Sequence, residues 1–288
     1  MKAPAFDYIK PNTCEDVFAL LAEYGDEARL LAGGQTLLAT LNMRLSEPAL
    51  LIDINGIEEL KGIALDGEKL RVNALARHSE IERSPLVAEH APLLALAAPH
   101  IAHRAIRNRG TFGGSIAYAD PAAEWPACAL TLDAHIVVRG MAGERRIAAT
   151  DFFLDLFTTA LAEGEMVVAC EIPIKKPGCV YAFDELARRH GDYAITGVAA
   201  AAQREGARLR ETRLAFLGIG NTPVRVRQTE RFLDGKAPTA AVLDEATAVL
   251  RAELDGELAP HADLTNSSAT KRHLATVLMR RVVASLAA

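Results

Sequence analysis

The feature of this sequence that most constrains its fold is a pair of adjacent glycines, Gly33 and Gly34, in the stretch LLAGGQTLLAT. The apolar run ARLL before them predicts a short buried strand, and TLLATLNMRL after them predicts a helix. Glycines between a strand and a helix form either an ordinary tight turn or a cradle of backbone N–H groups that binds an anion at the positive end of the helix. Both alternatives remain open from this stretch alone.

Neighbouring segments extend the pattern into a small α/β unit. TCEDVFALLAEYG predicts a helix with Thr13 as its N-cap and Gly25 at its end, and ALLIDING predicts a buried strand followed by a turn. Further elements are predicted along the chain: helices that open at His78 or Ser79, run from Leu86 to Pro99, and follow Pro121, and strands at residues 135–139 and 166–174.

The stretch PIKKPG, residues 173–178, is the most linker-like part of the chain, so we place a domain boundary there. Beyond it, YAITGVAAAAQREGARLRETRLAFLGIG predicts an antiparallel strand pair, and SATKRHLATVLMRRVVASL predicts a helix capped by Ser267 or Ser268. A chain of 288 residues is long enough for two domains. We predict a first domain over 1–175, with subdomains of about 1–55 and 56–175, and a second over 179–288.

A second glycine-rich stretch, GTFGGS, is predicted to form a loop and lies in the same predicted domain as the first. Two such segments that meet across a cleft match the two charged centres of a diphosphate. YADPAAEW then supplies Asp120 and Glu124; a dinucleotide needs a carboxylate for a ribose hydroxyl, although both residues are equally explained by the dipole of a helix that begins there. Neither the Walker nor the Rossmann glycine pattern is present. Three hydroxyl groups are further candidate donors, those of Thr36, Thr111 and Ser115.

Charge, hydropathy and cysteine usage exclude several classes of function. A net charge of -5 argues against a nucleic-acid partner, and the sequence has no apolar run of the roughly 20 residues that a membrane-spanning helix needs. The charged N-terminus is unlike a signal peptide, so we expect a cytoplasmic protein. The four scattered cysteines form no C-x-x-C pair, which predicts reduced thiols and no metal or iron–sulfur site in this chain.

These segments resemble a known family. LLAGGQTLLATLNMRLSEPALLIDING, followed by PHIAHRAIRNRGTFGGSIAYADPAAEWPA, is similar to the FAD-binding medium subunits of molybdenum hydroxylases, which include the carbon monoxide dehydrogenase and xanthine dehydrogenase groups. The likeness continues through YAFDELARRHGDYAI and LGIGNTPVR and covers nearly the whole chain. It implies an α+β protein, with a two-subdomain FAD-binding domain of the vanillyl-alcohol-oxidase type followed by a C-terminal α+β flavoprotein domain.

The resemblance also implies where FAD binds noncovalently. Glu124 matches the acidic position that contacts the adenosine ribose, and Asp120 is the second candidate carboxylate. Ile101 matches an apolar position beside the flavin, and Tyr193 matches a residue near the isoalloxazine ring. The diphosphate and its surroundings are assigned to two glycine segments: Leu31, Ala32, Gly33, Gly34, Gln35 and Thr36 in the first, and Thr111, Gly113, Gly114 and Ser115 in the second.

Some positions depart from the family pattern. Gln35 stands where several relatives have histidine, a change between polar groups that is compatible with binding. Asp184 aligns with a lysine of xanthine dehydrogenase relatives, which leaves flavin tuning at that position in question. His100 and His103 lie near the second glycine segment, but surface or packing roles are expected for them because the family holds its FAD without a covalent bond.

The function implied by the resemblance is electron transfer. The expected partners are a small subunit with two [2Fe–2S] clusters and a large subunit with molybdenum–pterin, assembled as a dimer of heterotrimers. No residue of this chain is then catalytic toward the organic substrate. Two alternatives remain: a self-sufficient FAD oxidoreductase of the same fold that acts directly on a small molecule, and an assembly subunit that has lost its flavin.

Overall fold

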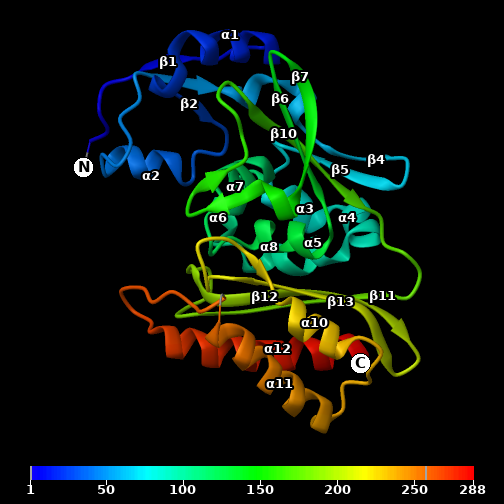
Figure 1. Cartoon of the computed structure of the whole chain (residues 1–288). Coiled ribbons are helices and arrows are strands. Elements are labelled where there is room, and N and C mark those ends of the chain that lie inside the picture. Colours follow the sequence, from blue (N-terminus) through cyan, green and yellow to red (C-terminus); the bar gives the residue numbers. More distant parts are fainter. Residues whose placement is uncertain (1, 257) are drawn as a thin grey trace.

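The computed structural model describes residues 2–256 and 258–288 of the chain. Figure 1 shows a small sheet and its helices at one end, a layer of helices in the middle, and a long sheet backed by helices at the other end. Three main sheets define this arrangement, with three, five and four strands. The first two sheets belong to the part of the chain before residue 175, and the third to the part after it.

The first sheet is parallel and has the strand order β1-β3-β2. Helix α1 (Cys14–Tyr24) leads into β2, and α2 (Leu37–Asn42) leads toward β3. Thr13 accepts a hydrogen bond from the backbone N–H of Asp16 and Gly25 ends α1, so both predicted boundaries of this helix are confirmed. The remaining elements of this unit are β1 (Asp7–Ile9), β2 (Ala28–Leu31) and β3 (Leu50–Asp53), with the short 3-10 turns η1 (Gly25–Glu27), η2 (Ile54–Gly56) and η3 (Glu58–Leu60).

The second sheet is antiparallel, with the order β4-β5-β10-β6-β7. Its central strand, β10 (Met166–Pro173), pairs with β5 (Lys69–Asn73) and β6 (His135–Gly140), while β4 (Ile63–Asp66) and β7 (Gly143–Ala148) form the edges. A hairpin of β8 (Phe153–Asp155) and β9 (Thr158–Thr159) precedes β10. Because β10 comes last in the chain, the sheet is completed by a strand nearly 100 residues away from β5.

The middle layer of helices packs between this sheet and the C-terminal one, where Phe112 and Trp125 are fully enclosed in the core. The predicted helix to Pro99 is interrupted at Ala91, because Pro92 cannot continue the hydrogen-bond ladder and instead begins a new helix. The helices are α3 (His78–Arg83), α4 (Pro85–His90), α5 (Pro92–Ala97), η4 (Ala98–His100), α6 (Arg104–Arg107), α7 (Phe112–Tyr118), α8 (Glu124–Thr131) and α9 (Ala149–Phe152).

The third sheet is antiparallel, with the order β11-β12-β13-β14. The predicted strand pair is confirmed as β12 (Ala194–Glu205) and β13 (Arg208–Leu217), whereas the sequence did not predict the long neighbouring strand β11 (Cys179–Ala187). Helices α5 and α8 cover one face, and α12 (Ser268–Ala287), capped by Ser267, packs on the other. The remaining elements are β14 (Val224–Arg225), α10 (Arg227–Leu233) and α11 (Ala240–Asp255).

The helices and the cysteines bear on the expectations about membrane spans and thiols. None of the helices in residues 2–256 and 258–288 is both long enough and apolar enough to cross a membrane. All four cysteines are free thiols, and Cys14, Cys128 and Cys170 are buried.

Candidate functional site

The first glycine segment leaves β2 and enters α2 with its backbone donors unused. In the part of the chain that the structure describes, the N–H groups of Gly33, Gly34, Gln35 and Thr36 donate to no protein acceptor. Gly34 has a φ of 72°, a left-handed conformation that glycine adopts at little cost. The Gln35 side chain donates to Gly33 O at 3.0 Å and so holds the turn from within. Four successive N–H groups without a protein acceptor, directly before a helix, form a site suited to binding an anion.

The second glycine segment differs from the loop that the sequence suggested. Gly113 and Gly114 lie in the first turn of α7, with Thr111 as its N-cap. Their N–H groups are already bonded, Gly113 to Ala74 O at 2.9 Å and Gly114 to Thr111 Oγ1 at 3.1 Å. The prediction of a loop at this glycine pair is therefore wrong, because the Thr111 hydroxyl caps a helix that begins at Phe112, one residue before the pair. Within the described residues, the run of successive backbone N–H groups without a protein acceptor therefore belongs to the first segment and not to the second glycine pair.

The two segments touch each other. A Cβ on Gly33 would lie 2.5 Å from Arg109 O and 2.7 Å from Gly110 Cα, so only glycine permits this approach of the two backbones. Gly110 is held in turn by His78, whose ring would lie 2.6 Å from a Cβ placed there. The two segments therefore lie side by side, in direct backbone contact.

Two side chains that sequence reasoning missed brace this contact. Asn55 Nδ2 donates to Ala32 O at 2.7 Å, and Arg77 Nη2 donates to Asn55 Oδ1 at 2.6 Å. Arg77 Nη1 also donates to Arg109 O, so a continuous chain of hydrogen bonds joins the first segment to the second. The sequence offered one indication, the Asn-Gly pair after β3. Such a pair predicts a turn, but it does not predict that the asparagine side chain binds another loop.

The glycines of α7 serve different purposes. A Cβ on Gly113 would lie 2.5 to 2.8 Å from Ala74, including its backbone, so this glycine permits close packing of α7 on the end of β5. A Cβ on Gly114 would approach only the Thr111 hydroxyl, at 2.7 Å. Gly114 therefore leaves space on the side of α7 that is not packed against the sheet. Ser115 and Thr36 lie on the two segments and are both partly exposed.

The two candidate carboxylates stand at the start of α8. Glu124 is its first residue, and Asp120 lies in the preceding turn, where Ala122 N donates to Asp120 Oδ1 at 2.9 Å. Burial, followed by the negative charge of Glu185, raises the pKa of Glu124 to about 8. Burial also raises the pKa of Asp120. Carboxyl groups that are costly to ionise are suited to hydrogen bonding with a ligand hydroxyl.

The pKa of Glu124 predicts a pH dependence of stability for the isolated chain. The folded-state pKa lies above the ordinary value of 4.5, so the stabilising effect of the protonated form is lost as the pH rises from about 4.5 to about 8. Burial lowers the pKa of His78 to about 4, so below pH 6.5 this histidine changes the stability in the opposite direction to Glu124. The effect of Glu124 is therefore best measured between pH 6.5 and pH 8. Urea unfolding is expected to show stability falling by up to about 1.4 kcal/mol per pH unit there. Glu124→Gln should flatten the profile, and an unchanged profile would contradict the assignment.

Ile101 and Tyr193 lie at the same end of the helix layer. Ile101 is buried directly after η4, while Tyr193 is 67% exposed. Partial burial of its phenol, and then the negative charge of Asp120, raises the pKa of Tyr193. His103 packs against Gly191 in the loop before Tyr193, in line with the expected packing role.

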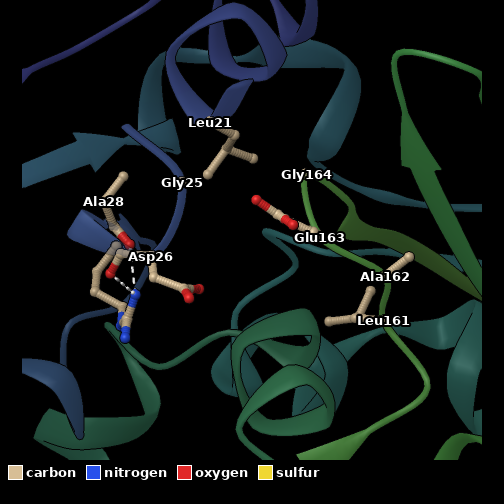
Figure 2. Close-up of a pocket in the computed structure, with 9 residues that line it drawn as sticks. Leu21, Gly25, Asp26, Ala28, Leu161, Ala162, Glu163 and Gly164 are labelled. Atoms are coloured by element: carbon tan, nitrogen blue, oxygen red, sulfur yellow. Dashed lines mark hydrogen bonds between the residues drawn. The ribbon is translucent and has the colours of Figure 1, made fainter. Parts of the chain in front are cut away.

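Two hollows of the structure differ in their position relative to these residues. One of about 400 Å³ is lined by Arg188, Arg189 and Asp192, next to Tyr193. The other, of about 460 Å³, is shown in Figure 2 and includes Gly25, Asp26 and Glu163 in its lining. It opens at the beginning of β2, the opposite end of the strand from Gly33, and none of the predicted site residues lines it. The second hollow is therefore separate from the glycine segments.

Comparison with known families assigns both halves of the chain. Residues 4–175 match the FAD binding domain in molybdopterin dehydrogenase, and residues 181–286 match the CO dehydrogenase flavoprotein C-terminal domain. The expected succession of an FAD-binding domain and a C-terminal flavoprotein domain is confirmed.

Individual relatives agree. The chain is 41% identical over 234 residues to the 6-hydroxypseudooxynicotine dehydrogenase complex subunit alpha of Paenarthrobacter nicotinovorans, covering 81% of this chain and 79% of the relative. It is 34% identical to the carbon monoxide dehydrogenase medium chain of Hydrogenophaga pseudoflava, covering 98% of this chain and 97% of the relative.

Solved structures show the same fold along the whole chain. A structure of carbon monoxide dehydrogenase from Hydrogenophaga pseudoflava has a TM-score of 0.94 at 35% identity, with 100% of this chain and 98% of that one covered. Quinoline 2-oxidoreductase from Pseudomonas putida 86 gives a TM-score of 0.93 at 36% identity, with the same two coverages of 100% and 98%. The chain therefore belongs to the FAD-binding medium subunits of the molybdenum hydroxylase family of oxidoreductases.

Proposed function

We propose that this chain takes electrons from [2Fe–2S] clusters on a partner subunit and passes them through its FAD to an external acceptor. The single observation that carries the proposal is the segment Gly33 to Thr36. Its N–H groups have no protein acceptor among the described residues, and Gly33 packs directly against the Arg109–Gly110 backbone. Backbone donors without a protein acceptor, with glycine at the points of closest approach, fit a diphosphate group. Relatives named as an alpha subunit and a medium chain support a role within a larger complex.

Different residues of the chain would bind different parts of the cofactor. The first segment, from Leu31 to Thr36, would bind the diphosphate through its backbone, and the open side of α7 at Gly114 and Ser115 would border the same group. Glu124, with Asp120 behind it, would accept a hydrogen bond from the ribose. Ile101 and Tyr193 would lie beside the flavin ring. When bound, the FAD supplies the electron-accepting chemistry, and the protein supplies position and electrostatics.

For the partners, we propose an iron–sulfur subunit and a molybdenum–pterin subunit, in a dimer of heterotrimers. The chain, expressed with its natural neighbours, is expected to co-purify with both, and native mass spectrometry would give the stoichiometry. Substrate added to the complex should bleach the visible absorbance of the flavin, whereas the flavin of the isolated chain should stay oxidised. Reduction of the isolated chain by substrate would favour a self-sufficient oxidoreductase, and a complex without flavin would favour an assembly subunit.

A further inference from the structure

Two neighbouring carboxylates on β11 point to opposite faces of the C-terminal sheet. Asp184 Oδ2 lies 3.5 Å from Arg281 of α12, on the face covered by the last helix. Glu185 Oε1 lies 3.6 Å from His100 Nδ1 at the end of η4, on the face toward the FAD-binding domain. Side chains alternate along a strand, so the two cannot share a face. Asp184 is the position at which the family resemblance left flavin tuning in question, and its side chain points away from the glycine segments. The side chain of its neighbour Glu185 points toward the FAD-binding domain.

Glu185 is buried with one oxygen unused. Its side chain is 6% exposed, and within the described residues Oε2 has no hydrogen-bond partner. Gly197 stands opposite on β12, where a Cβ would lie 2.8 Å from Glu185 Cβ, so the glycine makes room for the carboxylate. A buried carboxylate oxygen without a donor costs free energy, and such groups normally find a partner in the protein or in a ligand.

Glu185 lies near two residues that the proposed function assigns to the cofactor, Glu124 and Ile101. Its negative charge contributes, after burial, to the raised pKa of Glu124, and it also acts on the buried thiol of Cys128, so it lies close to the first turns of α8. His100 directly precedes Ile101. Among these neighbours, His100 is the one that can carry a positive charge, and its 3.6 Å separation is longer than a hydrogen bond.

We propose that Glu185 is a cofactor-facing residue whose Oε2 accepts a hydrogen bond from a hydroxyl or ring N–H group of the FAD. This inference rests on the proposed function, because it needs FAD bound at the glycine segments. FAD carries such donors on its ribityl chain, its ribose and the flavin ring. The site is then built in advance, since the carboxylate is fixed by β11 and Gly197 before the ligand arrives. It also sets a negative charge beside the cofactor, which opposes the addition of electrons to it.

The test compares two properties of the full-length chain that should move in opposite directions. Glu185→Met removes the acceptor and the charge at similar length. The FAD-free protein is expected to melt at a higher temperature, because an uncompensated buried carboxylate is gone. FAD, titrated into the same protein, is expected to bind about 10-fold or more weakly, since a hydrogen bond to a charged group is lost. Asp184→Asn, on the other face of the same strand, should change the affinity less than about 2-fold.

A conservative variant separates hydrogen bonding from charge. Glu185→Gln keeps an acceptor oxygen, so its FAD affinity should lie between those of the wild type and the methionine variant. Its flavin should be easier to reduce, with the equilibrium shifted about 10-fold, or about 30 mV for a two-electron couple. Spectroelectrochemical titration would measure this without enzymatic turnover.

The outcomes are distinct. If Glu185→Met melts at a lower temperature and binds FAD as the wild type does, the carboxylate is a structural partner of His100 and the inference is wrong. Unchanged affinity together with an unchanged flavin potential in both variants would overturn it as well. Failure of the wild-type chain to bind FAD at all would instead refute the proposed function.

Discussion

Replacement of Gly114 by valine is expected to give a folded protein that carries no FAD. The added Cβ would meet only the Thr111 hydroxyl within the protein, and the branched methyls would project into the open side of α7, where the diphosphate is expected. Displacing the capping hydroxyl should reduce stability by about 1 kcal/mol, a small part of the total. The affinity for FAD should fall by about 100-fold or more, which corresponds to about 2.7 kcal/mol.

The measurement is the ratio of flavin to protein absorbance in the purified chain, with circular dichroism to verify folding. Gly220→Val is the matched control, because a Cβ there meets no atom closer than 3.6 Å and the residue lies in a different loop. Gly113→Val provides the contrast, since its Cβ would collide with the Ala74 backbone and should lower stability before it affects binding. Stoichiometric FAD in the Gly114 variant would show that the diphosphate lies elsewhere.

Substitution of Asn55 by leucine is expected to damage both stability and FAD binding. The side-chain N–H of Asn55 donates to Ala32 O, and its side-chain oxygen accepts a hydrogen bond from Arg77. Leucine would leave this half-buried carbonyl and the guanidinium without these partners. Each lost partner costs about 1–3 kcal/mol, which gives an expected loss of about 3 kcal/mol in the free energy of unfolding. Because the same bonds join the two glycine segments, the cradle should lose its shape, and FAD affinity should drop more than 10-fold.

Chemical denaturation and FAD titration of the same preparation would test this result. Gln203→Leu is a suitable control, because Gln203 also donates to a backbone oxygen distant in sequence, that of Pro177, at 2.8 Å, but on β12 of the C-terminal sheet. A similar loss in both variants would mean that Asn55 does no more than an ordinary side-chain amide. Normal FAD affinity in a destabilised Asn55 variant would argue against a shared role in binding.

Features encoded locally could be read from the sequence. Thr13 and Ser267 cap the helices that their positions predicted, because capping depends on residues within one turn. The strand pair of residues 194–217 followed from its apolar content and central turn. That the two glycine segments meet was suggested by their similarity within one domain, and the family resemblance then supplied the ligand; the particular contact of Gly33 with Gly110 comes from the structure.

Features that depend on distant packing could not be read in this way. Nothing local distinguishes Asn55 in a turn from any other Asn-Gly, since its partner Arg77 comes 22 residues later. Likewise, which of Asp184 and Glu185 faces the cofactor depends on the pairing of β11, a strand that the sequence did not predict. The position of Thr111 as a cap, which moved the second glycine pair into α7, required knowing where that helix begins.

The place of β10 in the second sheet has a consequence for synthesis of the protein on the ribosome. Ala74, the platform for Gly113, donates its N–H to Val168 O of β10, so the support of the second glycine segment is completed by a strand made about 50 residues after that segment. Chains that have grown only to α8 contain every predicted diphosphate residue but lack the central strand beneath them. Cofactor capture should therefore follow, and not guide, the closing of this sheet, since long-range strand pairing is the slow step of such folds.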